Sequence, residues 1–407
     1  MMKPDNRRGQ WMLLSAILLA MLAYGMTLPL FPFLLESFGG SGIHMGLLVA
    51  VYGGLQLLSA PVWGRLSDSV GRKPLLLLGT AGLAGALVVF SLARNLWMLY
   101  LGQSILGSLT SALFPVASAY MSDSSDTQSR VGAIGRIGAA TGLGVVLGPG
   151  IGGILAFESV RFPFAIGGVW AIVVLLLMLV FLPESLVPAR RRADLHTRQK
   201  QSGFGLRLAC AAGRGPAAFG LFVVFAAYFG KSNFSGVFSL YAMQQFQYGT
   251  TEIGSLLMIM GLVYAISQGL LAGPVTKRIS ERDLIRFCLA GSAAGFTLLL
   301  VAWNYPALVA AITVLTVSNA ALKPASLSMI TRHSKGNYGA AMGVADVYMG
   351  LGRVLGPLWA GFAYDLDMGL PFMTGAAFFI ITLLTTLRKR DLTSQAESHS
   401  LEAGGQS

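Results

Sequence analysis

Residues 135–153 read GRIGAATGLGVVLGPGIGG, and residues 343–361 read GVADVYMGLGRVLGPLWAG. Small residues and one proline recur at identical spacings, as Gly135, Gly144, Gly148-Pro149 and Gly152-Gly153 in the first stretch and Gly343, Gly352, Gly356-Pro357 and Ala360-Gly361 in the second. The repetition indicates an internal duplication. Both copies lie in long apolar segments, where Gly and Pro are tolerated when neighbouring helices pack closely. The sequence therefore predicts a membrane protein built from two similar halves, as many transporters are.

The composition is that of a protein whose solvent is the bilayer. Hydrophobic residues make up 54% of the 407 residues and charged residues only 11%, with a mean hydropathy of +0.67. Runs of about twenty apolar residues each predict a membrane-spanning helix. Twelve such runs are expected, six in each half: Trp11–Leu35, His44–Trp63, Leu75–Leu92, Trp97–Met121, Val131–Ala156, Phe164–Leu182, Pro216–Ala242, Ile253–Gly273, Phe287–Trp303, Ala307–Ile330, Tyr338–Gly361 and Leu370–Leu387.

The basic residues orient this map. Most of the 29 Lys and Arg residues fall on one side, whereas Arg94 and Arg161 fall on the other. By the positive-inside rule both termini are expected in the cytoplasm of a protein that crosses the plasma or inner membrane many times. Topology and anionic inner-leaflet lipid account for the net charge of +12, so no nucleic-acid partner is expected.

The predicted domains follow from the same pattern. Residues 1–182 form a first six-helix bundle and residues 216–388 a second, joined by a basic cytoplasmic linker over 183–215 and followed by a polar, disordered tail over 389–407. Cys210 and Cys288 fall at the cytoplasmic starts of helices. We expect no disulfide, no metal site and no cofactor.

One loop carries a specific motif. Residues 64–74 read GRLSDSVGRKP. They resemble the Gly-x-Leu-Ala-Asp-x-x-Gly-Arg-Lys loop of the major facilitator superfamily, whose fold has twelve helices in two pseudo-symmetric bundles. In that family the loop holds the cytoplasmic side shut. The resemblance implies that Asp68 caps the start of the eleventh span and that Arg72 reaches Asp123. The gate residues it implies are Gly64, Asp68, Gly71, Arg72, Lys73, Asp123 and Arg130.

The Gly-Pro pattern of the fifth span resembles a signature of the family's twelve-span exporters that exchange drugs for protons. Pro29 and Pro32, which follow Gly25 in the first span, resemble the proline pair near the outer end of that helix in the same exporters. One residue departs from the family. Gln103 stands four residues before Gly107, where an Arg involved in proton coupling is usual, so the usual coupling role is not assigned to Gln103.

Few ionisable residues lie inside the predicted spans. Asp346 and Arg353 lie seven residues apart on one face of the eleventh span, while Lys323 lies in the tenth and Arg136 in the fifth. Ionisable groups inside a membrane are costly and are candidates for function. Asp346 is either the carboxylate that exchanges protons, tuned by a nearby cation, or one partner of a static buried ion pair. These two interpretations stay open at the level of sequence.

Lys231 lies near the middle of the seventh span, beside Asn233. Seventh helices of the superfamily line the central cavity, so the resemblance implies that Lys231 meets an anionic group on the substrate. The alternative is a lysine paired with another acceptor or reaching the membrane surface. Aromatic residues and Met suit an adaptable wall for amphiphilic ligands. The predicted cavity residues are Lys231, Asn233, Tyr24, Met26, Phe31, Tyr228, Phe234 and Gln103.

The sequence shows no nucleotide-binding loop, metal-ligand cluster or catalytic triad, so an enzyme and an ATP-driven pump are both unsupported. The favoured function is proton-coupled export of amphiphilic small molecules, such as drugs or a siderophore, by alternating access in a monomer surrounded by lipid. A lipid or lysolipid translocator on the same fold is the alternative within transport. A membrane receptor that does not transport is a third possibility.

Overall fold

The computed structural model describes residues 4–126, 128–185, 216–270, 280–332 and 338–404, with side-chain burial over a slightly smaller set. The described residues are helical throughout their ordered elements and contain no strand. The first half comprises α1 (Pro4–Thr27), η1 (Leu28–Leu30), α2 (Phe31–Glu36), α3 (Gly42–Val70), α4 (Arg72–Ser91), α5 (Leu96–Leu109), η2 (Thr110–Ala112), α6 (Leu113–Asp123), α7 (Arg130–Leu155) and α8 (Phe162–Phe181). The second comprises α11 (Pro216–Phe246), α12 (Thr250–Leu270), α14 (Glu281–Val301), α15 (Tyr305–Arg332), α16 (Tyr338–Leu366) and α17 (Leu370–Gly404).

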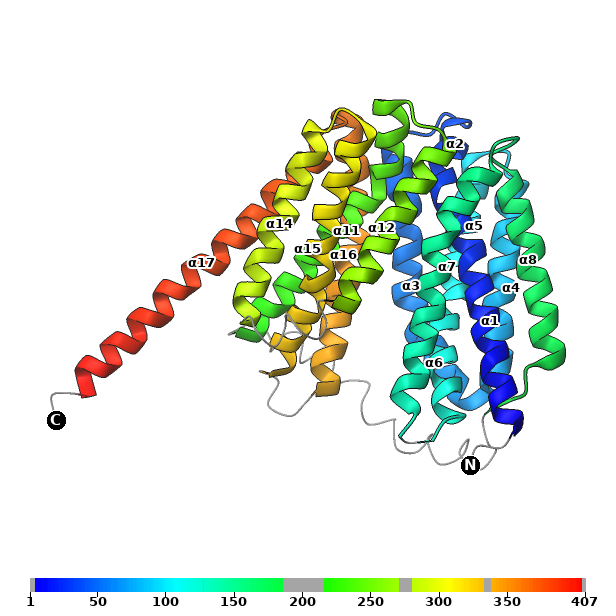
Figure 1. The fold of residues 1–407 in the computed structure, drawn as a ribbon, viewed down its shortest axis with the longest axis horizontal. Helices are drawn as coiled ribbons and strands as arrows, with labels where there is room; N and C mark the ends of the chain where they lie inside the picture. Colours follow the sequence, from blue (N-terminus) through cyan, green and yellow to red (C-terminus); the bar gives the residue numbers. More distant parts are fainter. Residues whose placement is uncertain (1–3, 127, 186–215, 271–279, 333–337, 405–407) are drawn as a thin grey trace.

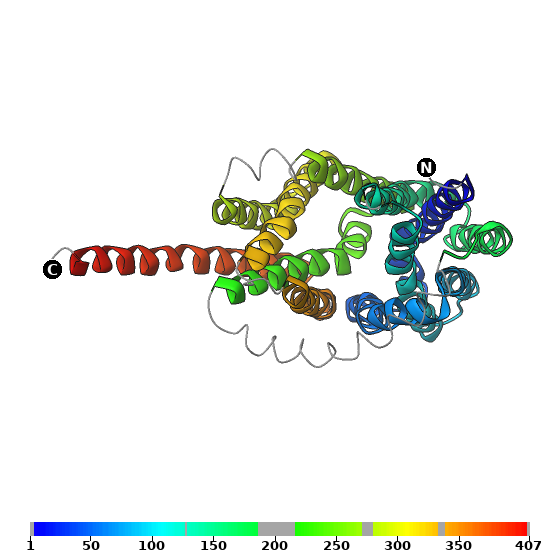
Figure 2. The ribbon, with the colours of Figure 1, turned by 90° about the horizontal axis from the view of Figure 1, so that it is seen from below.

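These helices form two side-by-side bundles (Figure 1). Seen along the helices, the two groups surround a central gap in the ribbon (Figure 2). In the described part of the chain, 11 helical spans are long and apolar enough to cross a membrane. The 29-residue α16 is also long enough, but Asp346 and Arg353 lower its hydropathy. It completes the predicted set of twelve, and the all-helical, two-bundle membrane fold is confirmed.

Local sequence explains where several helices begin and end. The side chain of Asn95 caps α5 by accepting a hydrogen bond from the Met98 amide at 3.1 Å. Gly71 separates α3 from α4 with φ of 122°, a left-handed conformation that glycine adopts without strain. Gly71 therefore allows the chain to turn sharply between these two helices.

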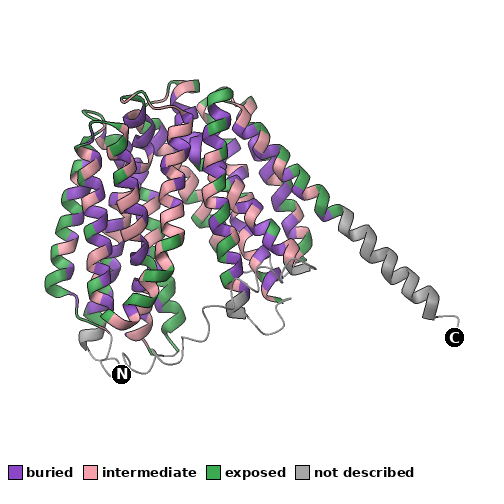
Figure 3. Cartoon of the chain, turned by 180° about the vertical axis from the view of Figure 1, so that it is seen from behind, coloured by how far each residue is buried: buried purple, intermediate pink, exposed green. Residues whose placement is uncertain are grey.

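Many large apolar side chains are exposed, in agreement with a lipid surrounding, and Figure 3 shows exposed residues along the helices of both bundles. Helix α8 exposes Val180 at 70% and Phe181 at 66%. Such a surface would be an aggregation-prone patch in water, but it is matched by lipid tails. The chain is a multi-pass membrane protein.

Two predicted segments stay predictions. Helix α17 is described as far as Gly404, and the expected disorder over 389–407 is not tested by that boundary. The predicted linker over 183–215, including Cys210, lies outside the described residues apart from 183–185. Among the described residues, Cys288 is a buried free thiol.

Candidate functional site

The two bundles meet closely at one end of the molecule. We call the end where α1 begins the terminal face and the other end the opposite face. At the opposite face, Asp365 at the end of α16 accepts hydrogen bonds from the start of α3: from Gly42 N at 2.6 Å and from Ile43 N at 3.0 Å. Nearby, Thr250 on α12 donates to the Gly153 carbonyl on α7 at 3.0 Å. Both contacts join one bundle to the other.

The duplicated glycines pack in equivalent ways within their bundles. A Cβ at Gly148 would lie 2.6 Å from the Gly25 Cα atom of α1, so α7 and α1 touch through their backbones. In the second copy, a Cβ at Gly356 would lie 2.6 Å from the Phe229 carbonyl of α11. Gly144 and Gly352 approach the same two partner helices. Each copy therefore fastens the fifth helix of its half to the first.

The last glycine of each copy crosses to the other bundle. A Cβ at Gly153 would overlap the Thr250 carbonyl of α12, and a Cβ at Gly361 would overlap the Gly42 carbonyl of α3. The repeat thus serves two purposes at once, packing within a bundle and close approach between bundles. The duplicated sequence therefore gives α7 and α16 the same two kinds of helix contact, one within the bundle and one between the bundles.

Toward the terminal face the same helices separate. Cβ atoms added at Gly135, Gly142, Gly269 and Gly343 would meet nothing within 4 Å. Figure 3 shows the bundles close together at the opposite face and apart at the terminal face. The structure is therefore open toward the terminal face and closed toward the opposite face.

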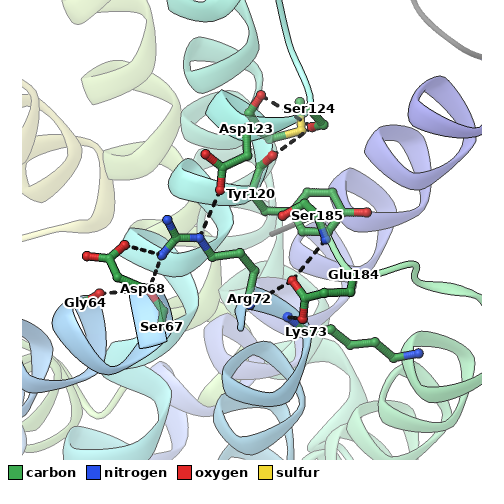
Figure 4. Close-up of polar contacts among 11 residues, drawn as sticks. Gly64, Ser67, Asp68, Arg72, Lys73, Tyr120, Asp123, Ser124, Glu184 and Ser185 are labelled. Atoms are coloured by element: carbon green, nitrogen blue, oxygen red, sulfur yellow. Dashed lines mark hydrogen bonds and ion pairs between the residues drawn. The ribbon is translucent and has the colours of Figure 1, made fainter. Parts of the chain in front are cut away.

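Five of the predicted gate residues take part in a network of polar contacts on the first bundle (Figure 4): Gly64, Asp68, Arg72, Lys73 and Asp123. Arg72 pairs with Asp68 at 2.7 Å and with Asp123 at 3.0 Å, and its Nη1 also donates to the Ser67 hydroxyl at 2.5 Å. The predicted contact of Arg72 with Asp123 is present. The Arg72 side chain is only 8% exposed, so these partners satisfy a guanidinium that is nearly withdrawn from water.

The structure also gives the positions of the other predicted gate residues. The Gly64 carbonyl accepts a hydrogen bond from the Ser67 hydroxyl at 2.8 Å, and Lys73 Nζ donates to the Leu179 carbonyl at 2.8 Å. Arg130 begins α7 as an exposed residue. The predicted cap by Asp68 concerns the first residues of α16, whose side chains lie outside the described residues, so it stays a prediction.

The sequence analysis missed Glu184, which binds the start of α4. Its carboxylate accepts from the Arg72 amide at 3.0 Å and from the Lys73 amide at 3.1 Å. A carboxylate at a helix N-terminus satisfies amides that have no partner within the helix. The bond ties the beginning of the linker to the gate motif. An acid directly after Pro183 was the available signal, but nothing in the sequence connected it to α4.

Three cations of the second bundle lie over the rings of Tyr228 and Tyr264. The guanidinium of Arg353 lies 5.0 Å from the Tyr228 ring centroid, and Lys323 Nζ lies 6.0 Å from it. Lys231 Nζ lies 5.0 Å from the ring of Tyr264 on α12. We call Tyr228, Lys231, Tyr264, Lys323 and Arg353 the central site. Within the described residues, none of its cations forms an ion pair.

Lys231 faces the space between the bundles. It is exposed, whereas its neighbours Gly230 and Asn233 on α11 are buried. Helix α11 packs against α15, α16 and α17 of its own bundle, so an exposed side chain at this depth points to the opening. The electrostatic influence of Arg353 and Lys323 reaches Lys231 as well. This placement agrees with Lys231 as a cavity residue, although its role stays a prediction.

Asp346 also lies on the open side. The residue is exposed, and the cations that act on its carboxylate are Arg353 and Lys323. Arg136, the third predicted partner, instead donates to the Gln10 side chain of α1 at 3.5 Å. The structure therefore associates Asp346 with the cations of the central site and places Arg136 with α1.

Five predicted cavity residues are packed inside the bundles. Met26 and Asn233 are 0% exposed, Phe234 3%, and Phe31 and Gln103 5% each. A side chain buried against its own bundle offers no surface to a ligand in this conformation, so the cavity role of these five stays a prediction. Phe31 packs edge-on against Phe90 at 5.1 Å. Asn233 donates to the Pro371 carbonyl of α17 at 3.0 Å.

Two of the predicted cavity residues, Tyr24 and Tyr228, lie at the central opening. Tyr52 and Gln56, which were not predicted, lie beside them. Tyr24 stacks on Tyr52 with ring centroids 6.0 Å apart. Gln56 donates to the Tyr52 hydroxyl at 3.3 Å and accepts from Arg353 at 3.3 Å. The polar amide of Gln56 in the middle of the second span was the available signal, but it carries no charge to mark it among apolar residues.

A two-bundle membrane protein that opens to one face, with charged groups between its bundles, has the architecture of an alternating-access transporter. The sequence profile of the Major Facilitator Superfamily matches residues 13–214 and 220–406. The chain belongs to the major facilitator superfamily, and it is a transporter rather than an enzyme.

Individual relatives cover nearly the whole chain. Multidrug resistance protein 2 of Bacillus subtilis (strain 168) is 29% identical over 378 residues, covering 92% of this chain and 93% of the relative. The class D tetracycline resistance protein of Salmonella ordonez is 30% identical over 378 residues, covering 91% and 94%. Among solved structures, the human organic anion transporter MFSD10 (TETRAN) has a TM-score of 0.64 and 26% identity, covering 94% of this chain and 100% of that one.

Proposed function

We propose that this chain exports amphiphilic small molecules from the cell in exchange for protons. Its similarity to multidrug and tetracycline resistance proteins over more than nine-tenths of its length supports an exporter. The observation that carries the proposal is the central site, where three cations and Asp346 lie between bundles that open to one face. Such a site offers both a place for a substrate and a carboxylate for a proton.

We further infer that the terminal face is cytoplasmic and the membrane is the plasma or inner membrane. The distribution of Lys and Arg in the sequence supports this orientation. In that orientation the open face receives substrate from the cytoplasm, as an exporter requires. One chain supplies both walls of the central opening, so we expect the monomer, surrounded by lipid, to be the working unit.

We also propose that an anionic group of the substrate binds Lys231. The similarity to a protein named as an organic anion transporter supports this preference. Lys231 has an aromatic ring beneath it, and the described residues offer it no carboxylate. A substrate carboxylate would fill that role through a charge-assisted hydrogen bond.

Replacing Lys231 by Ala should selectively impair the export of anions. Hydrogen bonds to charged groups contribute about 1.5–3 kcal/mol, so the KM for an anionic dye should rise about tenfold to a hundredfold. Export of a cationic dye should stay within about twofold. The measurement is dye movement in proteoliposomes after an imposed pH step.

Lys231→Arg is the matched control, since it keeps the charge and should restore most anion transport. Equal loss of anionic and cationic dye transport in Lys231→Ala would contradict an anion-binding role. Failure of the unaltered protein to move any dye of either charge in response to the pH step would overturn the proposed function itself.

A further inference from the structure

Gln56 holds Arg353 across the interface between the bundles. The residue belongs to α3 of the first bundle, and its Oε1 accepts from Arg353 Nη1 of α16 at 3.3 Å. Its Nε2 donates to the Tyr52 hydroxyl at 3.3 Å, which fixes the orientation of the amide. Arg353 also lies over the Tyr228 ring at 5.0 Å. The guanidinium therefore has a neutral amide as its acceptor, and that amide comes from the opposite bundle.

A neutral amide is a weak partner for a guanidinium. Hydrogen bonds between two charged groups are about twice as strong, and a carboxylate can bind a guanidinium through two parallel bonds. An organic carboxylate that enters the central site would therefore displace Gln56 from Arg353. Tyr24, Tyr52 and Tyr228 supply ring faces beside this position, so the attached group is expected to be aromatic.

We propose that Gln56 is a specificity-determining residue, whose amide oxygen occupies Arg353 until an aromatic carboxylate displaces it. This inference rests on the proposed export function and names the substrate class of the same site. It assigns Gln56 two effects. It lowers the affinity for anions by competing for Arg353, and it joins the bundles through Arg353 while no substrate is bound.

Two substitutions of Gln56 should act in opposite directions. Gln56→Leu removes the competing acceptor, so carboxyfluorescein should bind about three- to tenfold more tightly. Gln56→Glu places a permanent carboxylate beside Arg353, so carboxyfluorescein should bind at least tenfold more weakly, while the cation ethidium should bind equally well or better. Binding is measured on the purified full-length chain in detergent, from the ligand-dependent rise in melting temperature.

Gln244 offers a matched control. Its side chain accepts a hydrogen bond from the Tyr364 hydroxyl at 2.9 Å, near the opposite face, so Gln244→Leu should leave both affinities unchanged. The inference would be overturned if the affinity for carboxyfluorescein changed in the same direction in both Gln56 variants, or did not change in either. It would also be overturned if the unaltered chain did not bind carboxyfluorescein. The binding assay needs no ion gradient, so its failure is distinguishable from a failure of proton-driven export.

Asp365 joins the bundles at the opposite face through an independent set of bonds. It lies at the end of α16 and accepts from the Ser41 hydroxyl at 2.9 Å, the Gly42 amide at 2.6 Å and the Ile43 amide at 3.0 Å. All three donors belong to the start of α3 in the other bundle. A carboxylate at a helix N-terminus is favoured by the helix dipole and by amides that lack helical partners.

We infer that Asp365 is a latch that keeps the opposite face closed while the terminal face is open. Opening toward the opposite face separates α16 from α3, so these bonds must break once in each transport cycle. The role is conformational, because Asp365 is at the far end of α16 from Asp346 and does not touch the central site.

Spin labels at Glu158 and Asn304, both exposed at the opposite face, report on the latch. With the two native cysteines replaced by alanine, Asp365→Ala should raise the population with a long label-to-label distance about tenfold, as measured by pulsed electron resonance. Ser41→Ala removes one bond and should give a smaller rise.

Asp367 is the matched control for the latch. It accepts from the Gly369 amide of its own loop at 2.7 Å and makes no bond to the other bundle in the described structure. Asp367→Ala should leave the distance distribution unchanged. An unchanged distribution in Asp365→Ala, or an equal change in Asp367→Ala, would overturn the latch.

Discussion

Asp346→Asn should abolish proton-driven export. An amide cannot take up and release a proton, so the variant loses the step that couples the gradient to the substrate. In inside-out vesicles with an imposed pH gradient, substrate accumulation should fall at least tenfold. Exchange of labelled for unlabelled substrate without a gradient should continue, because it requires only binding and the conformational change. Asp346→Glu should retain part of the driven transport.

The competing interpretation gives a different result. If Asp346 only neutralises Arg353 and Lys323, which act on its carboxylate, then Asn should lower thermal stability and leave coupling intact. Driven accumulation at the normal level in Asp346→Asn would therefore exclude Asp346 as the proton carrier. Asp126→Asn, at an exposed position before α7, controls for the general loss of a negative charge.

The duplication made the architecture predictable from the sequence. Identical spacing in residues 135–153 and 343–361 implied two equivalent helices, and the structure places Gly148 and Gly356 in equivalent packing contacts. The contact of Arg72 with Asp123 followed from a motif with a fixed geometry. These predictions succeeded because close backbone approach and ion pairing each demand particular residue types at particular positions.

The cavity residues were less predictable for a physical reason. In a membrane helix the lipid-facing, core-facing and ligand-facing sides are all apolar, so hydrophobic periodicity does not separate them. Phe31 and Phe234 were therefore assigned to the cavity, whereas both are buried in aromatic clusters. Gln56 and Asp365 act across the bundle interface, and a single sequence does not show which helices of the two halves meet.

Gly46→Leu should hold the opposite face open. Gly46 lies on α3 where it crosses α16, and a Cβ there would overlap the Pro357 carbonyl and lie 3.0 Å from the Gly361 Cα atom. Neither neighbour is the flexible end of a side chain, so the helices must move apart. Overpacking typically costs about 1–3 kcal/mol, which would reduce the population open toward the terminal face about fivefold to a hundredfold.

Transport should fall at least tenfold in Gly46→Leu, because substrate then rarely finds the site open toward the terminal face. The distance between labels at Glu158 and Asn304 should increase in the same variant. Gly85→Leu is the control, since a Cβ at Gly85 meets nothing within 4 Å, and the main packing partners of α4 among the described helices belong to the first bundle. Normal transport with an unchanged distance in a stably folded Gly46→Leu would show that the bundles do not need this close approach. The repeat makes the same demand at Gly153, where α7 meets α12, so Gly153→Leu should reproduce the effect at the second crossing.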